Sequence, residues 1–99
     1  MKVLIVEDDP VTSLVLSRML TGRGYDVTAC VSAEEAMKVC QETVFPLLFL
    51  DLFLPGMDGF SFSRWVRRQP GGNQPLILSV PQAIEPRISP PHRRRRVSR

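Results

Sequence analysis

The sequence predicts an α/β domain built on a doubly wound parallel sheet. Four short apolar segments of strand length alternate with amphipathic segments, and Gly-rich or Pro-containing turns separate them. Strands that alternate with helices form βαβ units, whose right-handed crossovers make neighbouring strands parallel. The chain has 99 residues, enough for one domain, and 43% of them are hydrophobic. Since no run of about 18 apolar residues occurs, a membrane-spanning helix is excluded.

The first half of the chain predicts two strands and two helices. Residues 3–6 form a continuous apolar run, which is typical of a strand buried on both faces. Asp9 and Pro10 are the cap and first residue of a helix that runs to about Leu20. Residues 25–31 are the second strand. Helical spacing predicts a core-facing side of the first helix made of Val11, Leu14, Val15 and Met19.

A second helix follows, in which Ser32 and Glu35 have the spacing of a capping box. Residues 47–50 are the third predicted strand, which ends at Asp51, and residues 76–80 are the fourth. Between them lies a third helix, closed by the turn at 70–73. The predicted core-facing residues of the second helix are Ala33, Ala36, Met37 and Cys40. Those of the third are Phe62, Trp65 and Val66, with Arg64, Arg67 and Arg68 outside.

Charge divides the chain at Pro81. Residues 1–80 contain seven Lys and Arg against nine Asp and Glu, whereas residues 81–99 contain six Arg and one Glu. The second segment also contains four prolines, the run Arg93-Arg94-Arg95-Arg96 and no apolar periodicity. We therefore expect a domain at 1–80 and a disordered Pro/Arg-rich tail at 81–99. Contact with nucleic acid is expected only through this tail, which lacks aromatic residues for base stacking.

The cysteine and histidine content predicts neither a disulfide framework nor a zinc site. Cys30 and Cys40 are expected to be small core hydrophobes. His92 is the single histidine. Because Glu7 interrupts the first apolar run, the N-terminus does not resemble a signal peptide, and we expect a cytoplasmic protein without membrane contact.

Acidic residues follow two of the predicted strands. Glu7, Asp8 and Asp9 come after the first strand, Asp51 comes after the third, and Ser79 lies near the end of the fourth. Parallel strands place their carboxyl ends at one sheet edge, where ligands bind. Carboxylates held together repel one another, which raises their proton affinity, and Mg²⁺ relieves this repulsion. One carboxylate could then form an aspartyl phosphate, with the Ser79 hydroxyl donating to it. Asp9 also fits a simple role as a helix cap.

Three segments together resemble the response-regulator receiver domain of two-component signalling: residues 3–10, 48–59 and 76–79. The most specific is Asp51 followed, four residues later, by Pro-Gly-Met-Asp-Gly. The resemblance implies a flavodoxin-like sheet of strand order 2-1-3-4-5 with bound Mg²⁺. It implies that Asp51 accepts a phosphoryl group from a phosphohistidine of a sensor histidine kinase or phosphotransfer protein.

The same resemblance implies a role for each matching residue. Mg²⁺ would be bound by Asp8, Asp51 and the backbone carbonyl of Phe53, with Glu7 acting through a water molecule. Ser79 would be the switch hydroxyl. Gly59 would open the third helix, and Pro55 would fix the loop before it. The chain would not be a conventional enzyme: its chemistry would be at most Mg²⁺-dependent self-phosphorylation and dephosphorylation at Asp51.

The chain also departs from this family. Receivers continue with a fourth helix, a fifth strand that carries a lysine, and a fifth helix, whereas the lysines here are Lys2 and Lys38, neither of which matches. Val80 stands where the family has a small residue. We expect strand order 2-1-3-4 and impaired phosphorylation. The exposed edge of the fourth strand predicts a dimer, a partner-bound form or marginal stability. A truncated or frame-shifted gene would produce the change at Pro81.

Three alternatives remain. A receiver-like decoy would bind a kinase or another receiver without phosphotransfer, through Ser13, Ser17 and Arg18 on the outer face of the first helix. A haloacid-dehalogenase-type phosphatase also uses a nucleophilic aspartate, but its second aspartate would fall at Phe53. A dinucleotide site is disfavoured because Gly22-Arg23-Gly24 lacks the third glycine and does not directly follow a strand.

Overall fold

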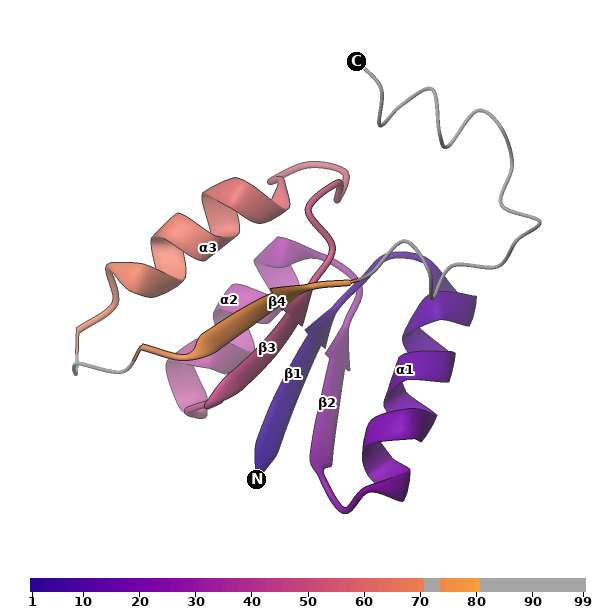
Figure 1. The fold of residues 1–99 in the computed structure, drawn as a ribbon. Coiled ribbons are helices and arrows are strands. Elements are labelled where there is room, and N and C mark those ends of the chain that lie inside the picture. Colours follow the sequence, from indigo (N-terminus) through magenta and orange to yellow (C-terminus); the bar gives the residue numbers. More distant parts are fainter. Residues whose placement is uncertain (71–73, 81–99) are drawn as a thin grey trace.

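The computed structural model describes residues 1–70 and 74–80, which form a four-stranded parallel sheet with helices on both faces (Figure 1). The strand order is β2-β1-β3-β4, which confirms the predicted fold. Helix α1 covers one face, and α2 and α3 cover the other. The elements are β1 (Lys2–Val6), α1 (Pro10–Gly22), β2 (Asp26–Cys30), α2 (Ala33–Glu42), β3 (Leu47–Leu50), α3 (Gly59–Arg67) and β4 (Leu76–Ser79).

Strand β1 is the centre of the hydrophobic core. It pairs with β2 on one side and β3 on the other, and its residues 3–6 have no exposed surface. Successive side chains of a strand point to opposite faces. Val3 and Ile5 accordingly pack with α1, while Leu4 and Val6 pack with α2 and α3. The predicted strand buried on both faces is thereby confirmed.

The parallel register brings all four strand ends to one edge of the sheet. Val6, the last residue of β1, is opposite Cys30 in β2 and Leu50 in β3. Leu50 in turn is opposite Ser79 in β4. Whatever follows β1 and β3 therefore begins at this carboxyl edge, which lies at the upper end of the strands in Figure 1.

Side chains cap the first two helices. The Asp9 Oδ2 atom accepts hydrogen bonds from the Thr12 backbone N–H (2.9 Å) and from the Thr12 hydroxyl (2.6 Å). The Ser32 hydroxyl oxygen accepts from the Glu35 N–H at 3.1 Å, which is half of the predicted capping box. The other half differs, because Glu35 Oε1 accepts from the N–H of Val31 (2.8 Å) rather than from that of Ser32.

The predicted core-facing side of α1 is wrong. Its four members are 41–53% exposed: Val11, Leu14, Val15 and Met19. The buried residues are Thr12, Leu16 and Leu20. The helix has apolar residues on more than one side, so helical spacing fits two overlapping sets. Thr12, which hydrogen-bonds Asp9, is buried, and Leu16 and Leu20, four and eight positions later, lie on the same face of the helix.

The other two helices face the sheet as predicted. In α2, Ala33 and Ala36 are buried, and Met37 and Cys40 pack against them. In α3 the buried residues are Phe62 and Val66, and the Trp65 ring stacks on Phe62 with centroids 6.0 Å apart. The three arginines of this region are exposed.

None of the described helices is both long and apolar enough to cross a membrane. Cys30 is buried and Cys40 half-buried, in agreement with their predicted place in the core. The closing turn of α3 at 71–73 lies outside the described residues. So do the predicted tail at 81–99, its arginine run and His92.

The orientation of α1 can be tested by comparing two leucines on the same helix. Leu16→Ala should lower the free energy of unfolding by about 2–4 kcal/mol, because it leaves a cavity beside the sheet. Leu14→Ala should change it by less than about 0.5 kcal/mol, since that side chain is half exposed. Urea denaturation measures both, and equal losses for the two variants would contradict the orientation.

Candidate functional site

Three carboxylates meet at the carboxyl edge of the sheet. Glu7, Asp8 and Asp51 each place an oxygen within 4.8 Å of the others. Glu7 and Asp8 directly follow β1, whereas Asp51 directly follows β3. The two strand ends are joined here, since the Asp51 N–H donates to the Val6 carbonyl at 2.9 Å. Residues more than 40 positions apart in the sequence thus form one acidic cluster, as the strand pattern predicted.

Glu7 is the most deeply buried member of the cluster. Its side chain has no exposed surface, and Oε2 accepts a hydrogen bond from the Asp9 N–H at 2.8 Å. Burial, assisted by the charge of Asp51, raises the pKa of Glu7 to about 8. At neutral pH the cluster without a cation therefore retains a proton on Glu7.

Asp51 is 5% exposed, and its Oδ1 atom accepts from the Phe53 N–H at 3.0 Å. Burial raises the pKa of Asp51 above its ordinary value, and the charge of Asp8 acts in the same direction. The Phe53 N–H thus fixes the orientation of the Asp51 carboxyl group, and burial favours the neutral form of that group.

The donor set fits a hard divalent cation. Each of the three residues offers a carboxylate oxygen, the ligand type that Mg²⁺ prefers. Asp8 Oδ1 is buried and accepts no hydrogen bond from the residues that the structure describes. A buried carboxylate oxygen without a donor is costly unless a cation compensates it. Glu7, Asp8 and Asp51 could therefore hold Mg²⁺, which would replace the proton on Glu7.

Asp9, the third acid of the first segment, does not belong to the cluster. Its Oδ2 atom receives both hydrogen bonds from Thr12 and caps α1. Of the three consecutive acids, Glu7 and Asp8 therefore belong to the cluster, and Asp9 caps the helix. This agrees with the capping role that the sequence predicted for Asp9.

The loop between β3 and α3 packs closely against the cluster. A Cβ atom on Gly59 would lie 2.6 Å from the Asp51 carbonyl oxygen and 2.6 Å from the Leu52 Cα. Only glycine fits there, so Gly59 lets α3 begin against the backbone of the cluster. Gly56 has φ +74, which favours glycine, and Asp58 Oδ1 caps α3 by accepting from the Ser61 N–H at 2.8 Å. The sequence prediction missed Asp58 as the cap of α3, although an aspartate three residues before Ser61 at a helix start is typical of an N-cap.

The remaining predicted site residues lie at the same edge. Ser79 ends β4 opposite Leu50, one position before Asp51, and is exposed. The N–H of Val80, which is buried, donates to the Leu50 carbonyl at 2.9 Å. Phe53 contacts Asp51 through its N–H. The roles assigned to Ser79, to the Phe53 carbonyl and to Glu7 stay predictions.

No lysine in the described part of the chain lies at the carboxyl edge. Lys2 begins β1 at the opposite edge, and Lys38 is exposed on α2. The lysine that the family resemblance implies therefore has no counterpart among residues 1–70 and 74–80.

The protonated state of Glu7 predicts how stability depends on pH. In the metal-free protein, the folded state binds a proton that the unfolded state releases above about pH 4.5, so stability falls as pH rises toward about 8. Glu7→Gln should flatten this slope and raise stability at pH 8 by at least about 1.4 kcal/mol, which is one pKa unit. Urea denaturation in a chelating buffer measures it, with Glu42→Gln, an exposed acid, as control. An unchanged slope in Glu7→Gln would contradict the burial of this proton.

Comparison with known proteins places the cluster in a family. The response regulator receiver domain profile matches residues 3–88. The transcriptional regulatory protein TcrA of Mycobacterium tuberculosis is 32% identical over 88 residues, covering 89% of this chain and 35% of TcrA. AfsQ1 of Streptomyces coelicolor is 38% identical over 75 residues, covering 76% of this chain and 32% of AfsQ1. The chain thus spans about a third of the length of these curated relatives.

Solved structures show the same similarity. A putative response regulator from Chloroflexus aurantiacus superposes with a TM-score of 0.75 at 35% identity, covering 79% of this chain and 64% of that one. The receiver domain of sensor histidine kinase PA1611 from Pseudomonas aeruginosa, with magnesium coordinated in its active site cleft, has a TM-score of 0.74 at 32% identity and the same two coverages. By its fold, its acidic cluster and its sequence, the chain belongs to the response regulator receiver domain family.

Proposed function

We propose that the chain is a phosphoryl-accepting signalling domain in which Asp51 is phosphorylated from a sensor-kinase phosphohistidine. An Asp51 carboxylate oxygen attacks the phosphorus, the bond between phosphorus and the histidine nitrogen breaks, and the imidazole leaves with the electron pair and takes up a proton. The observation that carries this proposal is the acidic cluster, in which Asp51 lies within 4.8 Å of Glu7 and Asp8.

Each of the proposed residues would have a separate role around Asp51. Asp8, Asp51 and the Phe53 carbonyl would bind Mg²⁺, with Glu7 acting through a water molecule. The ion would offset the negative charge of the incoming phosphoryl group. The magnesium bound by the Pseudomonas aeruginosa relative supports this assignment. Ser79 would donate its hydroxyl hydrogen to a phosphoryl oxygen. Because no described lysine reaches this edge, we expect slow transfer.

The exposed apolar side of α1 supports a kinase as the partner. Helix α1 begins two residues after Asp8 and exposes Val11, Leu14, Val15 and Met19, so a protein bound to its first turn would lie close to the acidic cluster. A solved structure of histidine kinase ThkA in complex with the response regulator TrrA superposes with a TM-score of 0.71 at 26% identity, covering 79% of this chain and 67% of that one. We place this encounter in the cytoplasm. The alternative function is a decoy that binds through Ser13, Ser17 and Arg18 of the same helix without phosphotransfer. Of these three residues Arg18 is exposed, whereas Ser13 and Ser17 are half-buried.

Replacing the acceptor separates these two functions. A phosphorylated kinase or phosphotransfer protein should transfer labelled phosphate to the wild type in the presence of Mg²⁺ and transfer none to Asp51→Asn. The same variant should lose the millimolar to sub-millimolar Mg²⁺ binding that calorimetry detects in the wild type. Asp26→Asn, an exposed acid at the amino end of β2, is the matched control and should retain both. Kinase binding without label on the wild type would establish the decoy, and label on Asp51→Asn would refute the proposed acceptor.

We also propose that two copies associate through β4. Within the described residues, β4 pairs only with β3, and its other edge is open. Leu76 is 60% and Leu78 39% exposed, both on the α1 face of the sheet beside Leu47 and Phe49. The strand contains neither charge nor proline, the features that normally prevent edge-to-edge pairing. Antiparallel pairing of two β4 strands about a two-fold axis would satisfy both edges.

A charge at this edge should prevent association. Leu76→Lys should sediment as a monomer at concentrations where the wild type sediments as a dimer. A charged lysine side chain cannot be buried where two β4 strands pair edge to edge. Val31→Lys, which alters a side chain of 62% exposure away from β4, should stay dimeric. A monomeric wild type at high concentration would contradict the proposal.

A further inference from the structure

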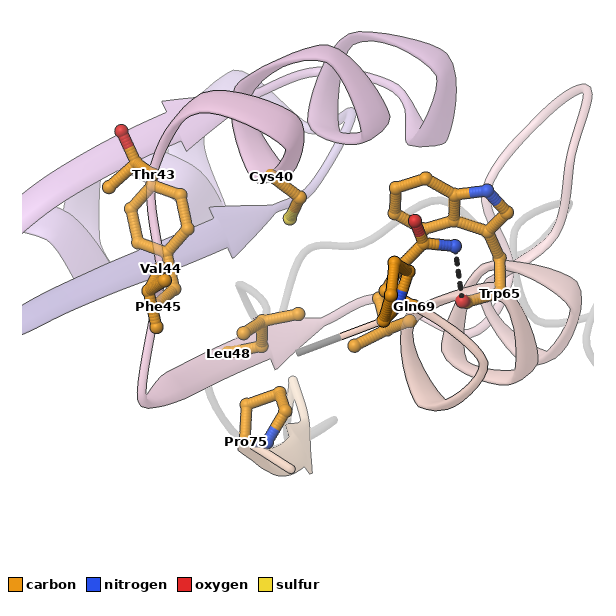
Figure 2. A pocket seen from close by; sticks show the side chains of 10 residues that line it. Cys40, Thr43, Val44, Phe45, Leu48, Trp65, Gln69 and Pro75 are labelled. Atoms are coloured by element: carbon orange, nitrogen blue, oxygen red, sulfur yellow. Dashed lines mark hydrogen bonds between the residues drawn. The ribbon is translucent and has the colours of Figure 1, made fainter. Parts of the chain in front are cut away.

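A cavity lies at the edge of the sheet opposite the acidic cluster. It has a volume of about 80 Å³ and opens between the ends of α2 and α3 (Figure 2). Its walls come from the last turns of both helices, from the start of β3 and from the residue before β4. The lining residues are Cys40, Thr43, Val44, Phe45, Leu48, Trp65, Val66, Gln69, Pro70 and Pro75.

The lining of this cavity is entirely uncharged. Thr43 and Gln69 are its polar side chains, and Gln69 is held in place because its Nε2 donates to the Trp65 carbonyl oxygen at 3.0 Å. The Cys40 sulfur points into the cavity in Figure 2. Burial raises the pKa of the Cys40 thiol to about 11, so it is neutral at physiological pH. A charged ligand would lose its hydration here without compensation, which selects a neutral one.

The size of the cavity limits the group that enters. An apolar cavity of about 150 Å³ holds benzene, and this one has about half that volume. It therefore suits a short aliphatic group rather than a ring. Val44, which is 58% exposed, lies at the rim of the cavity.

We propose that this cavity binds a neutral small molecule through a short branched aliphatic group, packed between Trp65 and Cys40 and able to hydrogen-bond the Gln69 side chain. The site is separate from the acidic cluster, because it adjoins the starts of β3 and β4 whereas the cluster adjoins the ends of β1 and β3. It does not depend on phosphorylation.

The probes are 3-methylbutanamide and two matched molecules. 3-Methylbutanoate has nearly the same shape but carries a charge, and acetamide lacks the branched group. Trp65, the single tryptophan of the chain, gives the fluorescence signal. Cys40 gives a second signal through its alkylation by iodoacetamide, because Cys30 is only 2% exposed. Mass spectrometry of peptides from the digested, alkylated protein identifies the modified cysteine.

The neutral amide should shift Trp65 fluorescence saturably. It should slow Cys40 alkylation about tenfold at about ten times its dissociation constant. 3-Methylbutanoate and acetamide should do neither. Cys40→Leu, which fills the cavity, should abolish the fluorescence response. Lys38→Leu, on the exposed face of the same helix, should keep both signals.

Circular dichroism and Mg²⁺ binding at the distant cluster would show that each variant is folded. Should Cys40→Leu fail to fold, Gln69→Leu supplies a second variant, expected to bind the amide more weakly without loss of the cluster. No response to 3-methylbutanamide in the wild type, an equal response to 3-methylbutanoate, or an unchanged response in Cys40→Leu would each overturn the proposal.

Discussion

The mutual repulsion of three carboxylates at one buried sheet edge is the constraint on which this molecule depends. Glu7 and Asp51 are almost without solvent, and Asp8 lies beside them. Such an arrangement is unfavourable without a proton or a cation, and burial, assisted by the charge of Asp51, raises the pKa of Glu7 to about 8. The fold tolerates it because β1, the most buried strand, and β3 hold the acids in place through a fully apolar scaffold. A divalent cation would relieve the repulsion between the carboxylates and would offset the negative charge of an incoming phosphoryl group.

Helix capping and backbone conformation account for several residues around the cluster. Asp9 caps α1, whereas Glu7 and Asp8 belong to the cluster. In the segment Pro55–Gly59, Gly56 takes a left-handed conformation, Asp58 caps α3, and Gly59 has no room for a Cβ atom. Three of the five positions of this segment therefore meet backbone requirements close to Asp51.

Sequence reasoning predicted those features that depend on strand order and on local capping. The four strands, their parallel direction and the meeting of Glu7, Asp8 and Asp51 followed from the alternation of apolar runs with helical segments, and the strand order followed from the family resemblance. The facing of α1 did not follow, because its leucines, valines and methionine fit two helical stripes, and the buried stripe begins at Thr12, a polar residue that hydrogen-bonds Asp9. The partner of Glu35 and the cavity beside Cys40 depend on side-chain packing between distant elements, for which the chain carries no local signal.

The central claim is that acids from the ends of β1 and β3 share one divalent cation. Paramagnetic broadening by Mn²⁺, observed in amide spectra of the whole chain, tests it most directly. The account predicts that substoichiometric Mn²⁺ broadens the amides of Asp8, Asp9 and residues 51–53 and that excess Mg²⁺ reverses the effect. Broadening centred instead on exposed acids such as Glu34, Glu42 or Asp26, with the amides of Asp8 and Asp51 unaffected, would contradict it.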